Sequence, residues 1–68
     1  MKIEYDKEVD AAYIYLKDTI KESEVKKSVE LKENIIFDYD NGGKLIGVEI
    51  LDASKVLNKE VLLKAQEA

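Results

Sequence analysis

A strand–turn–strand pattern in the middle of the chain constrains the fold more than any other feature. Two apolar runs, residues 35–40 and 44–51, are separated by Asp40-Asn41-Gly42-Gly43. Asp, Asn and Gly tolerate the positive φ angles that tight hairpin turns require. The pattern therefore predicts that residues 35–40 and 44–51 pair as an antiparallel hairpin. Gly47, inside the second strand, predicts a bulge or the close approach of another group.

A helix is expected directly after this hairpin. Ser54 is a good N-cap residue, with Asp52 as the alternative cap, so the helix should begin within two residues of Ser54. Apolar residues then recur at helical spacing, which predicts one amphipathic C-terminal helix. Its apolar positions are Val56, Leu57, Val61, Leu62, Leu63 and Ala65.

The remaining residues predict further strands. Residues 2–5 and 24–32 alternate polar and apolar, which is typical of strands with one buried face. Residues 11–17 carry four consecutive large apolar or aromatic residues and favour a strand covered on both faces, although a helix beginning at Glu8 competes with it. Residues 18–23 form a loop. We therefore expect one α+β domain, residues 1–68, in which a single antiparallel sheet of four or five strands carries one C-terminal helix on one face.

Composition excludes several kinds of site. The 68 residues contain neither Cys nor His, so disulfides and thiolate or imidazole metal sites are excluded, and we assign no cofactor. The net charge is −4 and all eleven basic residues are Lys, which argues against direct nucleic-acid binding. No apolar run approaches the ~20 residues of a membrane span, and no signal region is visible. These features predict a cytoplasmic chain that contacts neither nucleic acid nor membrane.

Chain length predicts self-association. A core in a domain this small rarely supplies more than ~3–5 kcal/mol, yet 46% of the residues are hydrophobic. One short helix shields at most one face of the expected sheet. The other face should therefore be buried in a symmetric dimer. Aromatic residues are enriched in interface cores, so the expected contact residues are Tyr13, Tyr15, Leu45 and Leu51.

Acidic residues in or beside the hairpins form the second candidate site. They are Asp6, Asp10, Asp38, Asp40, Glu49 and Asp52. Paired carboxylates, with Asp38, Asp40 and Glu49 as the candidate residues, could hold Mg²⁺ or act as acid and base. The alternative is structural: Asp at the start of a turn, and Glu49 facing solvent or paired with a Lys across the sheet. We favour the structural interpretation and assign no catalytic, cofactor-binding or metal-binding residue.

Several segments carry a resemblance to a known family. They are Tyr5-Asp6, residues 10–16, residues 36–40 and residues 43–54, the last ending in Gly47-Val48-Glu49-Ile50-Leu51-Asp52-Ala53-Ser54. In these segments the chain resembles the YuzE-like small proteins of domain-of-unknown-function family 2283. The family has no established activity and offers no catalytic residues to carry over. The resemblance implies an antitoxin-like partnership with a small ribonuclease-type toxin.

Two functions remain open at this point. The first is a small non-enzymatic interaction protein that forms a homo-oligomer and, as the resemblance implies, partners a ribonuclease-type toxin. Its acidic surface would suit such a basic partner. The second is a metal-assisted hydrolase that uses the hairpin carboxylates.

Overall fold

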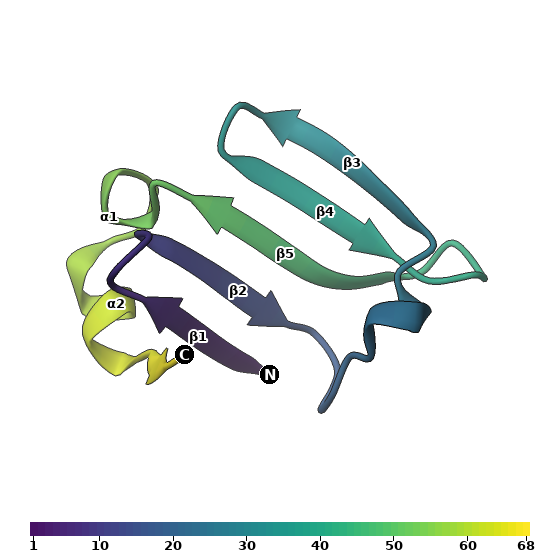
Figure 1. Ribbon diagram of the computed structural model, residues 1–68, viewed down its shortest axis with the longest axis horizontal. Coiled ribbons are helices and arrows are strands. Elements are labelled where there is room, and N and C mark those ends of the chain that lie inside the picture. The colour runs from purple at the N-terminus through teal and green to yellow at the C-terminus, as the bar shows by residue number, and fades with distance from the viewer.

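The structure, a computed structural model that describes residues 1–68, consists of one six-stranded sheet and two short helices (Figure 1). Its strands lie in the order β3-β4-β5-β2-β1-β6. All neighbouring strands are antiparallel except β1 and β6, which are parallel. In chain order the elements are β1 (Lys2–Asp6), β2 (Ala11–Tyr15), the 3₁₀ turn η1 (Glu22–Glu24), β3 (Lys27–Lys32), β4 (Ile35–Tyr39), β5 (Leu45–Leu51), α1 (Ala53–Val56), α2 (Lys59–Lys64) and β6 (Gln66–Glu67).

The central hairpin is confirmed. β4 and β5 pair antiparallel, and the connecting turn uses the residues that the sequence indicated. Gly43 has a φ of 79°, which only glycine adopts without strain. The Asp40 carboxylate accepts hydrogen bonds from the backbone N–H groups of Gly42 and Lys44, both at 2.9 Å. Local turn chemistry therefore sets this register.

The expected antiparallel sheet of four or five strands with one helix is corrected in two respects. The sheet is mixed, because β6 adds parallel to β1 and the Ala68 N–H donates to the Tyr5 carbonyl at 3.1 Å. The helix is divided, because Leu57 is extended and α2 begins after Asn58. The Asn58 side chain accepts from the Glu60 N–H at 2.7 Å. A bond from an Asn side chain to a backbone N–H two residues later is typical of a helix N-cap, so it favours the start of a new helix at this point.

Element ends also differ from expectation. The second strand stops at Tyr15 rather than residue 17, and β3 begins at Lys27 rather than residue 24. The loop of residues 18–23 runs into η1. The helix start is confirmed, because α1 begins at Ala53. None of the helices has the length and apolar character needed to cross a membrane.

Cross-strand register gives the sheet two different faces, because directly paired residues project to the same side. We call one the apolar face: its rows run Val29, Phe37, Val48, Ile14, Ile3 and Ile35, Ile50, Ala12, Tyr5. We call the other the tyrosine–carboxylate face: its rows run Ser28, Asp38, Gly47, Tyr15, Lys2 and Glu30, Ile36, Glu49, Tyr13, Glu4.

The hydrophobic core is small and lies at one end of the apolar face. Only four hydrophobic residues are buried, and no large side chain is completely so. Leu57, between the two helices, and Leu62 on α2 pack against a cluster centred on Ala12, Ile50 and Ala53. Figure 1 shows α2 beside β1 and α1 at the end of β5, whereas β3 is the edge strand farthest from α2. Every residue of β3 is exposed.

Candidate functional site: the tyrosine–carboxylate face

A tyrosine–aspartate bridge crosses the middle of the tyrosine–carboxylate face. From β2, the Tyr13 hydroxyl donates to the Asp38 carboxylate on β4 at 2.7 Å. From β3, the Ser28 hydroxyl donates to the other Asp38 oxygen at 2.6 Å. Asp38 is only 8% exposed, and a buried carboxylate is costly unless it is hydrogen-bonded. The bridge therefore ties together strands from both hairpins.

Gly47 makes the bridge possible. It lies on β5, between the strands that carry Tyr13 and Asp38. A Cβ atom at Gly47 would lie 2.1 Å from the Tyr13 hydroxyl oxygen and 2.6 Å from its Cζ atom. The expected close approach at Gly47 is thus confirmed, and its physical reason is that the Tyr13 ring passes directly over the glycine.

In the Tyr13–Asp38 hydrogen bond, the proton stays on the Tyr13 hydroxyl. Burial, followed by the hydrogen bond to Asp38, raises the pKa of the Tyr13 hydroxyl far above its ordinary value. The hydroxyl therefore remains a neutral donor at physiological pH, and the aspartate remains its acceptor. A tyrosine in this state donates a hydrogen bond and is not a nucleophile.

Tyr15 extends the polar network toward the β1 edge. Its hydroxyl donates to the Glu4 carboxylate at 2.7 Å, and this bond raises the pKa of Tyr15. Its ring meets the Tyr13 ring edge-on, with 4.8 Å between centroids. The Lys2 ammonium group lies 4.4 Å from the centre of the Tyr15 ring and 3.9 Å from Glu4. Both predicted interface tyrosines thus have their hydroxyls bonded within the chain.

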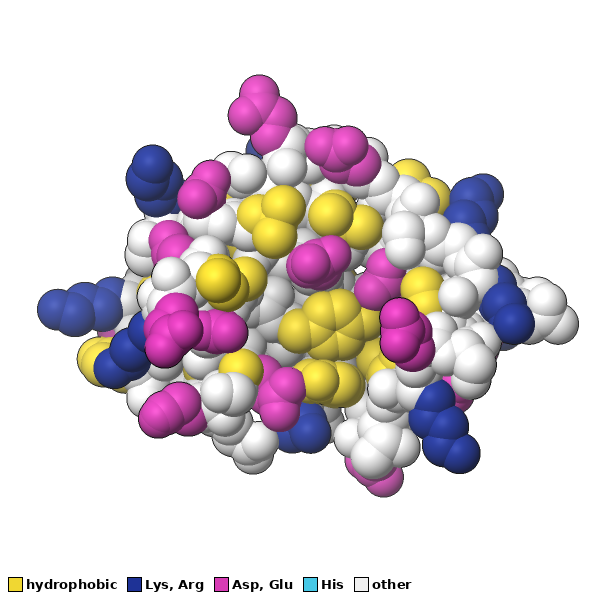
Figure 2. Space-filling model, viewed as in Figure 1, with side chains coloured by type: hydrophobic (Ala, Val, Ile, Leu, Met, Phe, Trp, Pro, Cys, Tyr) yellow, Lys and Arg dark blue, Asp and Glu magenta, His cyan; other side chains and the backbone are white.

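Glu49 is the one half-buried carboxylate of this face that has no partner. It lies directly opposite Tyr13 and Ile36, yet it makes neither an ion pair nor a side-chain hydrogen bond. Of the two structural alternatives, solvent or a cross-strand Lys, the Lys pair is not formed. Leu51, on the same face, is 37% exposed, and Leu45 at the start of β5 is 39% exposed. In the view of Figure 2, acidic and hydrophobic side chains occupy the middle of the molecule and lysines lie at its rim.

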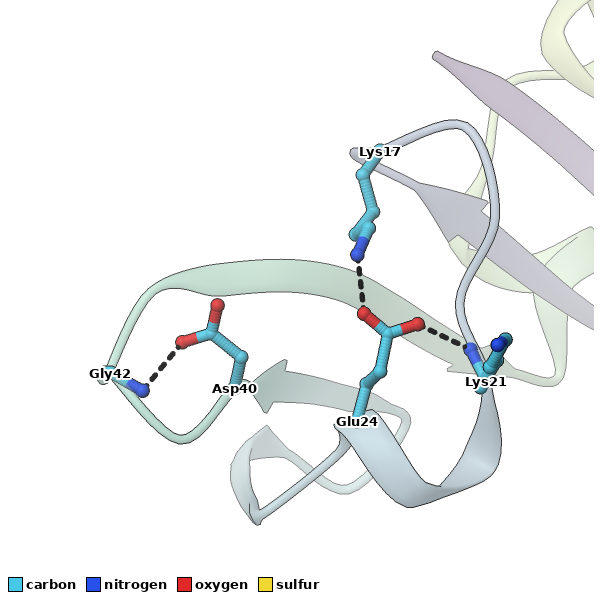
Figure 3. Close-up of polar contacts among 5 residues, drawn as sticks. All are labelled: Lys17, Lys21, Glu24, Asp40 and Gly42. Carbon is cyan, nitrogen blue, oxygen red and sulfur yellow. Dashed lines mark hydrogen bonds and ion pairs between the residues drawn. The ribbon is translucent and has the colours of Figure 1, made fainter.

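The three acidic candidates do not form one site. Asp38 belongs to the tyrosine bridge, Asp40 holds the β4–β5 turn, and Glu49 is unpaired. Figure 3 shows the Asp40 carboxylate facing the Gly42 N–H. It also shows Glu24 between the Lys17 ammonium group and the Lys21 N–H, contacts that hold the loop before β3. No group of three or more Asp or Glu residues lies together as metal ligands would.

A second polar cluster joins the β1–β2 turn to α1 around Asp10, an acidic residue noted in the sequence without its contacts. Asp10 accepts hydrogen bonds from the Tyr5 hydroxyl at 2.7 Å, the Ser54 N–H at 3.0 Å and the Ser54 hydroxyl at 2.7 Å. The expected N-cap, Ser54, is therefore wrong: the alternative, Asp52, occupies the cap position without a side-chain bond, and Asp10 provides the carboxylate instead. No local signal could reveal this contact, because it spans 44 residues of sequence.

Acid should weaken the Asp10 cluster. The bonds from Tyr5 and then Ser54 hold the Asp10 pKa below its ordinary value. A lowered native pKa stabilises the fold above the unfolded pKa of about 3.9, and this stabilisation is lost as the pH falls through the native value. We expect Asp10→Asn, which tolerates the positive φ of this residue, to melt below wild type at neutral pH. The difference in melting temperature should shrink as the pH falls below the ordinary carboxyl pKa and through the lowered native pKa of Asp10. Melting curves across this range measure it, and a constant gap would contradict the assignment.

Hollows in the surface lie away from the tyrosine–carboxylate face. The largest, about 620 Å³, is lined by Lys32, Glu33, Asn34, Ile35 and Val56. A second, about 390 Å³, is lined by Lys26, Lys27, Val29, Tyr39, Asp40, Asn41 and Gly43. Neither contains Tyr13, Tyr15, Glu49 or Asp38. The candidate site is therefore an open surface and not part of either hollow.

Comparison with known proteins places the chain in a family. The family described as Protein of unknown function (DUF2283) matches residues 2–54. An uncharacterized protein of Methanocaldococcus jannaschii is 41% identical over 58 residues, which are 85% of this chain and 46% of that protein. The chain thus spans about half the length of this curated relative. No solved structure matches the chain. The matched segment includes the hairpins, Gly47 and both polar clusters, and the chain belongs to the DUF2283 family of proteins of unknown function.

Proposed function

We propose that this chain is a small non-enzymatic protein-binding module that self-associates and binds a basic partner protein through its tyrosine–carboxylate face. The observation that carries the proposal is Glu49, a half-buried carboxylate without a partner beside Tyr13. A lysine or arginine from another protein would supply the missing charge. Charge pairs shielded from water in this way fix the orientation and partner choice of an interface.

The surroundings of Glu49 support the same partner chemistry. Glu30 and Glu4 lie in its row, whereas Lys2 is the one basic residue in the two rows of this face. The tyrosines are already held by internal hydrogen bonds, so binding would cost little side-chain entropy. Aromatic side chains of this kind are enriched in interface cores.

A ribonuclease-type toxin is the partner class that we propose. A protein that binds RNA presents a cationic surface to the phosphates, and such a surface is complementary to this face. Blocking it would inhibit the toxin, which is the antitoxin-like role. No observation favours the hydrolase alternative, because the acidic residues do not converge on a common site.

Charge reversal at Glu49 tests the proposal. The tagged wild-type chain, Glu49→Lys and Glu8→Lys are used to capture proteins from the native host. Glu8 is the matched control, because it is an exposed glutamate in the β1–β2 turn, outside the rows of the tyrosine–carboxylate face. We expect wild type and Glu8→Lys to capture one basic protein. Glu49→Lys should capture at least ten-fold less of it, which corresponds to a loss of about 1.4 kcal/mol or more in binding free energy.

The captured protein then decides the role. Purified by itself it should cleave RNA, and equimolar wild-type chain, but not Glu49→Lys, should inhibit the cleavage. Binding should weaken as salt is raised, since exposed charges are screened. Equal capture by all three chains, or an acidic captured protein, would refute the proposed face.

A further inference from the structure

We propose that the β3–β4 part of the apolar face is the self-association surface and that a second copy of this chain occupies it, the two copies being related by a twofold axis. The inference rests on the self-association in the proposed function and adds its location, on the face opposite the tyrosines. It thereby leaves the tyrosine–carboxylate face of each copy free for another protein.

The apolar rows of the sheet continue beyond the helices. Val48 and Ile14 pack against the helix-covered cluster, but the same row extends to Phe37 on β4 and Val29 on β3. Phe37 is only half-buried and Val29 is 38% exposed. We call Val29, Ile35, Phe37 and Tyr39 the open strip. The largest surface hollow adjoins it at Ile35, and another hollow is lined by Val29 and Tyr39.

The face of the strip, rather than its edge, is the contact surface. β3 is the edge strand, and it begins with Lys27 and ends with Lys32. Its pairing with β4 is irregular between Glu30 and Lys32. Lysines and bulges are the features by which edge strands avoid pairing with other chains. The edge of β3 is therefore disfavoured for pairing with a strand of a second copy. The sheet of a second copy can still pack face to face against the open strip.

Charge selects a second copy as the occupant. Each copy has a net charge of −4, so two copies repel each other across their acidic surfaces. The open strip itself contains no charged residue. Lys27 lies opposite Tyr39 at its end, and the hollows beside the strip contain charges of both signs. Lys26 and Lys27 lie near Asp40 in one hollow, and Lys32 lies beside Glu33 in the other. A twofold contact can therefore bring opposite charges together around an uncharged centre.

Dimensions set the strength of this contact. The broad side of the molecule measures 33 × 25 Å, or about 825 Å² as a flat rectangle. The open strip lies on two of the six strands and covers only part of this side, so each copy contributes less than this area and the contact does not exceed the standard interface size of ~1,600 Å² in total. This predicts a reversible dimer whose population rises with concentration. It also relieves the shortage of buried hydrophobic residues in the single chain.

Adjacent substitutions on β3 test the inference. Val29→Lys places a charge in the open strip, whereas Glu30→Lys changes the neighbouring residue on the opposite face. Sedimentation velocity is run from low to high micromolar concentration, with circular dichroism as the check on folding. We expect wild type and Glu30→Lys to approach twice the 7.7 kDa chain mass. Val29→Lys should remain at 7.7 kDa with an unchanged spectrum.

Two further results complete the test. If Val29→Lys is unfolded, Val29→Thr keeps the β-branched shape and should raise the dimer dissociation constant several-fold. A monomeric wild type, or equal dimerisation of Val29→Lys and Glu30→Lys, overturns the inference. The two proposals fail separately: capture of the basic partner depends on Glu49, whose substitution leaves the dimer intact, and dimerisation depends on Val29.

Discussion

Replacing Gly47 by alanine should lower the free energy of unfolding by about 2–4 kcal/mol, a large share of the stability of so small a domain. The added Cβ atom would lie 2.1 Å from the Tyr13 hydroxyl oxygen. Tyr13 must then move away, which breaks its bond to Asp38 and leaves a buried carboxylate without one of its donors. Urea unfolding of the two proteins at neutral pH measures the difference.

A double-mutant cycle separates this mechanism from a general intolerance of alanine in β5. In a Tyr13→Ala background no ring lies over Gly47, so the same glycine substitution should cost less than about 1 kcal/mol. Additive losses in the cycle would show that Tyr13 is not the cause. A Gly47→Ala protein as stable as wild type would show that the ring does not cross the glycine in solution.

Removing the Asp38 carboxylate should have the next largest effect. Asp38→Ala leaves the Tyr13 and Ser28 hydroxyls without their acceptor and creates a small void, at a cost of about 2–3 kcal/mol. Asp38→Asn keeps one acceptor oxygen and the side-chain shape, so it should cost less. The matched control is Asp18→Ala, an exposed aspartate with no side-chain hydrogen bond, which should change stability by less than about 0.5 kcal/mol.

The same unfolding experiment compares these variants. A destabilised Asp38→Ala beside an unaffected Asp18→Ala identifies the bridge as the cause. Equal stability of all the variants would mean that water replaces the lost hydroxyl partner at no cost. The Tyr13→Phe and Asp38→Ala substitutions should also be non-additive, because each removes the same hydrogen bond.

Several parts of the fold could be predicted because their causes are local. The β4–β5 hairpin follows from Asp40 to Gly43, whose backbone preferences set the turn. The position of Ser54 also located the start of α1, although the carboxylate that bonds to this helix end comes from Asp10. The glycine inside β5 marked a close approach, since the absence of a side chain within a strand has few other uses. Family membership was also visible in these same segments.

Other parts could not be predicted, because their causes lie far apart in the sequence. In the sequence Asp38 is one of three acidic candidates, and its role is decided only when β2 and β3 bring Tyr13 and Ser28 to it. The break between α1 and α2 was hidden by apolar residues that keep helical spacing across Leu57. The parallel strand β6 depends on an unpaired edge of β1, which exists only in the assembled sheet.

The sequence by itself determined the turns, the alternation of the strands and the absence of thiol and imidazole chemistry, since these depend on residue type and nearest neighbours. Only the tertiary structure decided which carboxylates are bound and which is free. Asp10 caps a helix 44 residues away, Asp38 bridges two hairpins, and Glu49 is left half-buried beside Tyr13 without a partner. The physical reason is that hydrogen-bond partners are chosen by distance in space, and the pairing of β2 with β5 sets those distances.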